Sequence, residues 1–180
     1  MWVFTRSGGV WSQQGSKLVG TGGVEAAQGW SVALSDDGNT AVVGGPGDHS
    51  HAGAVWVFTR SGGAWSQQGS KLVGTSAVGN GHQGSSVALS GDGNTAIVGG
   101  YGDNSNTGAT WVFTRTGNVW TQQGSKLVAT DAVGALSRLL RCALRRCEYR
   151  RRGRVWRQLE CRGRVGLYRP PVPDGDQRRR

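Results

Sequence analysis

The first 134 residues contain no cysteine, and the three cysteines of the chain, Cys142, Cys147 and Cys161, all follow them. Without a thiol, this part gives no indication of its compartment. No apolar run is long enough to span a bilayer. The amino terminus also lacks a leader with a charged and then an apolar region. We therefore expect a cytoplasmic protein or a chain whose true start lies upstream.

Charge is also scarce in residues 1–134, where three Lys and three Arg stand against seven acidic residues. Residues 135–180 carry 15 Arg against four acidic residues. The net charges of the two parts are −1 and +11, which together give the +10 of the whole chain. This change in composition divides the chain into a weakly charged part, residues 1–134, and an Arg-rich tail, residues 135–180.

A repeat organises the weakly charged part. The stretch WVFTRSGGVWSQQGSKLVGT at residues 2–21 returns with few changes at residues 56–75 and 111–130, at spacings of 54 and 55 residues. Self-similarity at such a period is typical of repeat architectures in which each unit packs against its neighbours. The chain is therefore an array and does not have the sequence pattern of an ordinary single domain.

One full repeat, residues 29–84, predicts β structure throughout. Alternating or continuously apolar stretches are separated by turn residues such as Asp36-Asp37-Gly38-Asn39, and no stretch has a helical period. Pro46–Ala52 is expected to be a polar loop. The predicted strands are residues 30–35, 40–45, 53–60 and 64–73.

A single four-stranded antiparallel sheet cannot bury both of its faces, and radial stacking of such sheets solves this problem. We therefore expect an all-β fold in which residues 1–134 form about two and a half antiparallel four-stranded blades of a partial β-propeller. An irregular, disordered basic tail would follow. A β-solenoid is the alternative, although its coils are usually shorter than this period.

The motif GWSVALS–DGNTAVVGGPGD–GAVWVF at residues 29–58, and its second copy at residues 84–113, resemble the FG-GAP repeat. This is the blade unit of integrin α-chain amino-terminal propellers and of many bacterial surface proteins. The resemblance covers residues 1–134. It implies a β-propeller with a structural, adhesive or ligand-binding role at the cell surface or in secreted form, and further blades in a longer parent protein.

The resemblance also implies calcium, which many members bind in an Asp-x-Asp-x-Asp-Gly loop. Here the corresponding stretches are Asp36-Asp37-Gly38-Asn39 and Gly91-Asp92-Gly93-Asn94. They are too short and too poor in carboxylates to surround an ion that needs six to eight oxygen ligands. We therefore expect hairpin turns at both positions and no cofactor.

Asp48 and Asp103 occupy the same place in the loop between the second and third strands of the two copies. Because strands alternate in direction, this loop and the linker Gly74–Gln83 to the next repeat are expected to share one end of the sheets. That end holds most of the variation between copies, as binding loops do. The two Asp are candidates for binding a ligand or cation, and loop capping by an Asx-type turn is the structural alternative.

Tryptophans recur in every copy at Trp2, Trp56 and Trp111 and at Trp11, Trp65 and Trp120. They could form a sugar-binding shelf, but a Trp shared by every repeat favours packing between the sheets. His49, His51 and His82 lie in polar loops, and no repeated Ser/His/Asp or paired-carboxylate arrangement accompanies them. The sequence contains no catalytic constellation, so we expect a protein that is not an enzyme.

The Arg-rich tail has a separate explanation. If each codon from Arg138 to Tyr168 is read one nucleotide downstream, the stretch can encode another repeat, starting Gly-Ser-Ser-Val-Ala-Leu-Ser as at residues 84–90. We therefore interpret the tail as a frameshifted repeat. The alternative is a basic nucleic-acid-associated protein that acts through clustered arginines. Under the frameshift interpretation the tail binds polyanions only non-specifically, and its three cysteines are free thiols and form no zinc site.

Overall fold

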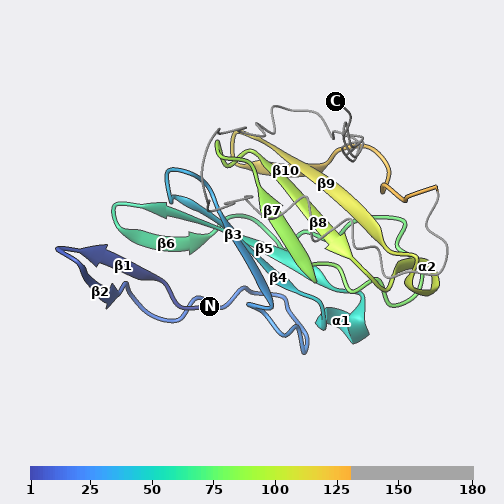
Figure 1. Cartoon of the computed structure of the whole chain (residues 1–180), viewed down its shortest axis with the longest axis horizontal. Coiled ribbons are helices and arrows are strands. Elements are labelled where there is room, and N and C mark those ends of the chain that lie inside the picture. Colours follow the sequence, from blue (N-terminus) through green and yellow to red (C-terminus); the bar gives the residue numbers. More distant parts are fainter. Residues whose placement is uncertain (131–180) are drawn as a thin grey trace, which may run out of the picture. The chain divides into compact units, whose positions relative to one another are not determined.

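The computed structural model describes residues 1–130, which form ten β-strands and two single helical turns (Figure 1). The predictions about the Arg-rich tail, its three cysteines and its start near residue 134 fall at or beyond the end of this part. They lie outside the described residues.

The strands form one two-stranded and two four-stranded antiparallel sheets, each in chain order. The amino-terminal hairpin pairs β1 (Phe4–Ser7) with β2 (Val10–Gln13). The first sheet contains β3 (Ser31–Leu34), β4 (Thr40–Gly45), β5 (Ala54–Ser61) and β6 (Ala64–Gln67). The second sheet contains β7 (Ser86–Leu89), β8 (Thr95–Gly100), β9 (Ala109–Thr116) and β10 (Val119–Gln122).

The expected all-β fold of antiparallel sheets is confirmed, and each full repeat forms one four-stranded sheet. Two details differ from the prediction. The fourth strand ends at Gln67 instead of Val73, and Leu72 then pairs with Val55 as an isolated bridge. The loop after β4 contains a helical turn, α1 (Asp48–His51), and its counterpart after β8 contains α2 (Asp103–Asn106).

The hairpins between the first two strands of each sheet are closed by side-chain hydrogen bonds. In the first sheet, Asp37 Oδ1 accepts bonds from Ser35 Oγ at 2.5 Å and from the backbone N–H of Asn39 at 2.9 Å. These bonds hold the pKa of the Asp37 carboxyl below its usual value, with the Ser35 bond the largest cause. The hairpin turns expected here are confirmed.

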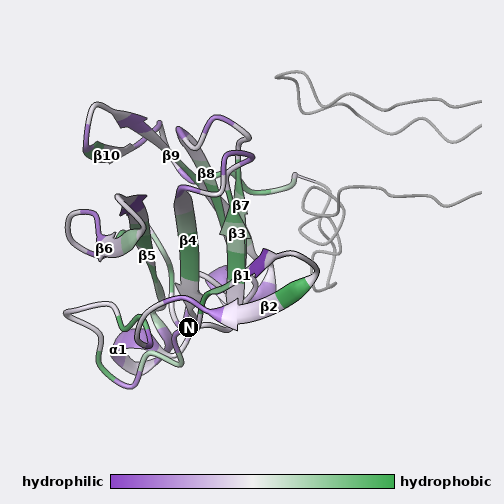
Figure 2. Ribbon diagram, turned by 90° about the vertical axis from the view of Figure 1, so that its left-hand side faces the viewer, coloured by the Kyte–Doolittle hydropathy of each residue, from purple (hydrophilic) through white to green (hydrophobic). Residues whose placement is uncertain are grey.

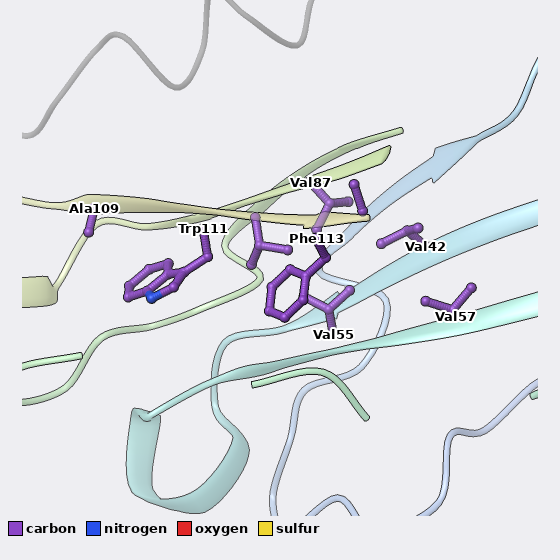
Figure 3. Close-up of a cluster of buried hydrophobic side chains, with 9 residues drawn as sticks. Val42, Val55, Val57, Val87, Ala109, Trp111 and Phe113 are labelled. Atoms are coloured by element: carbon purple, nitrogen blue, oxygen red, sulfur yellow. The ribbon is translucent and has the colours of Figure 1, made fainter. Parts of the chain in front are cut away.

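The two four-stranded sheets pack face to face, with β3 and β4 of the first sheet against β7 of the second. Their shared core consists of apolar side chains from both sheets, and Figure 3 shows Phe113 of β9 beside Val55, with Trp111 further along the same strand. Nine buried residues form this core: Val42, Val55, Val57, Val87, Ala96, Val98, Ala109, Trp111 and Phe113. Figure 2 shows the apolar character of β3, β4 and β7.

The recurring tryptophans of the third strands are both core residues. Trp111 belongs to the shared core, and Trp56 belongs to a second core on the other face of the first sheet. Trp56 and Trp111 have no exposed surface, and their indole N–H groups donate to Thr21 O and Thr75 O, both at 2.8 Å. A side chain at Gly20 would collide with Trp56, so glycine is required there. The preference for a packing role is confirmed at these two positions. Trp2, their counterpart in the amino-terminal hairpin, is 57% exposed.

Candidate functional site

The turns α1 and α2 have an unusual backbone. His49 and Ser50 in α1 have φ values of 46° and 55°, and Asn104 and Ser105 in α2 have 48° and 54°. The next residue in each turn also has positive φ. Successive non-glycine residues in this left-handed region are strained, and such strain persists only where the surroundings over-determine the conformation. The contacts of the preceding Asp provide that constraint.

Asp48 is 1% exposed and joins three separate segments of the chain. Its Oδ1 accepts the backbone N–H of Val24 at 2.8 Å, which fixes the linker that precedes the first sheet. Its Oδ2 lies 2.5 Å from Lys71 Nζ, beyond the end of β6, and 3.0 Å from His49 Nδ1. Both carboxylate oxygens are therefore engaged by partners within the chain.

Asp103 repeats this arrangement in the second sheet. Its Oδ1 accepts the backbone N–H of Val78 at 2.7 Å, and its Oδ2 lies 2.6 Å from Lys126 Nζ. The carboxylate is fully buried, and its lysine is largely so. We refer to the pairs Asp48–Lys71 and Asp103–Lys126 as the staples, since each ties the linker, the turn and the end of the fourth strand together.

The electrostatics at Asp48 favour its ionised form. Burial raises the pKa of this carboxyl, but the hydrogen bonds from Lys71, Val24 and His49, with the charge of Lys71, outweigh burial. The net pKa therefore lies below the usual value. A buried carboxylate that is both paired and hydrogen-bonded avoids the cost of burying an isolated charge.

The structure places each candidate Asp against the linker that precedes its own sheet, Asp48 at Val24 and Asp103 at Val78, so that loop and linker share one end of each sheet as the strand directions predict. The capping differs in kind from an Asx-type turn, because the bonded partners Val24 and Val78 lie 24 and 25 residues away in sequence. Ligand or cation binding by Asp48 and Asp103 stays a prediction. The surface available to a ligand consists of the exposed side chains that follow Asp48 and Asp103 in α1 and α2.

Those presented side chains differ between the copies. His49, Ser50 and His51 of α1 are exposed, and Asn104, Ser105 and Asn106 of α2 are exposed at the same positions. We call these six residues the turn surface. In α1 alone, the Lys71 ammonium also lies 3.0 Å from His49 Nδ1. This contact among Asp48, His49 and Lys71 is not repeated in α2, where Asn104 stands in place of the histidine.

A second group of rings extends the turn surface towards the linker. His82 stacks on Tyr101 with ring centroids 4.5 Å apart, and His51 lies against His82 at 5.0 Å. The backbone N–H of His82 donates to His51 O at 2.8 Å. Burial, and then the charge of His51, lower the pKa of His82, and a bond to the Pro46 backbone offsets part of this effect. The lowered pKa favours the neutral form of His82.

Sequence reasoning missed two sets of structural partners. The staple lysines belong to the QGSKLV segment shared by all three copies, which has the pattern of a peripheral strand. The second set is Gln28 and Gln83, each of which precedes the first strand of a sheet. Gln83 is 1% exposed and bonds both backbone groups of Gly74, at 2.5 and 2.9 Å. The repetition of Lys and Gln in each copy was the available signal.

The residues present do not fit the calcium ion that the family resemblance implies. The Asp37 carboxylate closes its own turn, and Asp36 lies against Gly91 of the neighbouring turn. Within residues 1–130, no group of three or more His, Cys, Asp or Glu side chains is placed to hold a metal. A calcium ion requires six to eight oxygen ligands, which these turns do not supply.

Within the described residues, no helix has the length and apolarity needed to cross a membrane.

The site itself is a pair of strained turns, each held by its Asp–Lys pair, with exposed side chains that differ between the repeats. Comparison with known proteins finds no matching family model and no similar curated protein.

Proposed function

We propose that residues 1–134 are FG-GAP-like blades of a partial β-propeller, and that this module is a non-enzymatic binding or structural unit at the cell surface or in secreted form. The support for blades is that each repeat forms one sheet and that successive sheets pack in series. The face of the first sheet that carries Val55 and Val57 packs against the face of the second that carries Trp111 and Phe113. Repetition of this packing step generates a radial array.

The observation that carries the binding role is the contrast between the staples and the turn surface. The staples are the same in both copies, at 2.5 and 2.6 Å, yet they hold His-Ser-His in α1 and Asn-Ser-Asn in α2. A constant scaffold that presents variable, exposed side chains is typical of binding loops. The partner we propose is a protein or glycan recognised by imidazole and amide groups.

An exchange of the turns tests this role. The double variant His49→Asn, His51→Asn gives α1 the side chains of α2 while keeping Asp48 and Lys71, so the fold should be unaffected. Screened against a glycan array and extracellular-matrix proteins, the parent chain should show ligands whose binding drops at least about tenfold in the variant, the effect of losing about 1.4 kcal/mol. A ligand bound equally by both chains would place the binding surface elsewhere.

The second candidate function is nucleic-acid binding through the Arg-rich tail, which is favoured by the net charge of +11 on residues 135–180. Such binding would show selectivity for nucleic acid over other polyanions and would survive replacement of the turn surface. Under our proposal, any polyanion binding is non-specific and follows charge alone.

A further inference from the structure

The amino-terminal hairpin of β1 and β2 corresponds to the last two strands of a four-stranded repeat sheet. Met1 exchanges two hydrogen bonds with Leu18, its N-terminal amine donating to Leu18 O at 2.9 Å and its O accepting from Leu18 N at 2.8 Å. Val55 makes the equivalent pair with Leu72. By this correspondence, β1 and β2 are the third and fourth strands of a repeat sheet.

The first two strands of that sheet are not among the described strands. In the first sheet, β5 pairs with β4 along its other edge from Ala54 to Thr59, in six registered pairs. In the part of the chain that the structure describes, β1 pairs with β2 alone. The backbone from Met1 to Thr5 therefore presents an open strand edge, which is a template for pairing with another strand.

An apolar hollow of about 230 Å³ lies beside this edge, with Val3, Val32 and Leu34 in its lining. Val32 is 44% exposed and Leu34 55% exposed. Val87, the counterpart of Val32 in the second sheet, is only 6% exposed because the first sheet covers it. The fold thus shows what covers this surface elsewhere: the first two strands of the preceding repeat.

A polar contact adds specificity to the packing of one repeat's first two strands on the next sheet. Ser31 Oγ in β3 donates to Gly84 O, ahead of the second sheet, at 2.7 Å. Ser86, its counterpart in β7, has a buried hydroxyl without a hydrogen-bond partner in the described residues. A serine at this strand position therefore needs the glycine carbonyl of the next sheet, and Gly29 occupies that place ahead of the first sheet.

We propose that the β1 edge and the adjoining hollow form an acceptor site for a β-hairpin of the type formed by the first two strands of this repeat. The hairpin would have the pattern of residues 84–100, with its second strand antiparallel to β1 in the register of β8 on β9. Ile97 and Ala88 of the hairpin cover Val32 and Leu34, and its serine donates to Gly29 O. Backbone bonds give affinity, and the alternating side chains give specificity.

The probe is a synthetic peptide with the sequence of residues 84–100, GSSVALSGDGNTAIVGG, added to the full 180-residue chain. We expect saturable uptake with one peptide per chain by native mass spectrometry. Hydrogen exchange should slow at the amides of residues 1–5 and stay unchanged at residues 119–122 of β10.

Two variants test the surface. Val32→Asp with Leu34→Asp places charges in the hollow, while Val119→Asp, at a site 64% exposed on β10, is the matched control. The first should weaken peptide binding by at least about tenfold, since two apolar contacts are lost, and the control should leave binding unchanged. The peptide variant Ile97→Asp should also fail to bind. The near-ultraviolet circular dichroism spectrum, to which the buried Trp56 and Trp111 contribute, checks that each chain variant is folded.

Absence of peptide uptake by the folded chain would overturn the proposal, and so would equal affinity for the Val32→Asp, Leu34→Asp variant. A chain that forms stable dimers and excludes the peptide would also contradict it. The inference rests on the assignment of β1 and β2 as half a blade in the proposed function. Its readout is independent of the turn surface, so loss of ligand binding in the His49→Asn, His51→Asn chain leaves peptide uptake intact.

Discussion

Lys71 Nζ lies 2.5 Å from Asp48 Oδ2, and 55 residues later Lys126 Nζ lies 2.6 Å from Asp103 Oδ2. In both pairs the carboxylate is almost fully buried and its other oxygen accepts a backbone N–H from the preceding linker. This ion pair is the element that both copies share at the end of the sheets where their sequences differ most.

Lys71→Met should therefore be strongly destabilising. It leaves the buried charge of Asp48 uncompensated, which costs about 3 kcal/mol or more in the free energy of unfolding. The double variant Asp48→Asn, Lys71→Met should recover part of that loss, and urea denaturation measures both. Lys17→Met is the matched control, since Lys17 Nζ lies over the exposed ring of Trp2 at 5.2 Å, and its loss should cost under about 1 kcal/mol. Equal effects of Lys17→Met and Lys71→Met would refute the staple.

Stability should fall as the pH drops from 7 to 5 because of His82. Its pKa in the folded chain is lowered, so below the usual value of about 6.5 the unfolded chain binds more protons than the folded chain. His82→Phe keeps a ring against Tyr101 and removes the titration, so its stability should vary less over this range. Thermal unfolding at several pH values measures this difference. Asp48, whose pKa is also lowered, stays ionised throughout. A steeper pH dependence of stability in His82→Phe would contradict the predicted loss of stability through protonation of His82.

Gln83→Leu should destabilise the second sheet's linker. The substitution removes the partners of the buried N–H and C=O of Gly74, and each unsatisfied group costs about 1–3 kcal/mol. Gln28→Leu is the comparison, because Gln28 makes the same two bonds to Gly20 at 2.6 and 2.8 Å but is only half-buried. Its cost in denaturant unfolding should be smaller. A larger loss of unfolding free energy for Gln28→Leu than for Gln83→Leu would show that burial of the glutamine does not determine this loss.

Removal of residues 135–180 should abolish heparin binding, because residues 1–134 have a net charge of −1. For the full chain, the affinity should fall steeply with salt concentration, as expected for counterion release. Duplex DNA and heparin of matched charge should compete equally, as measured by fluorescence anisotropy. Strong preference for one nucleic-acid sequence would favour the alternative function instead.

The sequence predicted the sheets well because strand signals are local. Thr40–Gly45 was expected as a strand and is β4 at the same bounds, since its apolar run is bordered by turn residues. The hairpin of Asp37 and Asn39 followed from the chemistry of those residues alone. The tryptophans were assigned to packing because every copy carries them.

The turn surface could not be predicted in the same way. His49-Ser50-His51 contains no glycine to signal positive φ, and Asp48 at the start of the turn pairs with a lysine 23 residues away. The local sequence Gln-Gly-Ser-Lys gives no sign of that contact. Long-range ion pairs of this kind become visible only when the strands are placed in three dimensions.

The account depends most on the stacking of the two repeat sheets, and a double-mutant cycle between Val55 and Phe113 tests it most directly. Both side chains lie in the shared core (Figure 3). Val55→Ala and Phe113→Ala should show a coupling of at least about 0.5 kcal/mol in unfolding free energy. Val43→Ala, whose side chain belongs to the separate core on the other face of the first sheet, should be additive with Phe113→Ala. Additivity of Val55→Ala with Phe113→Ala would contradict the stacked arrangement.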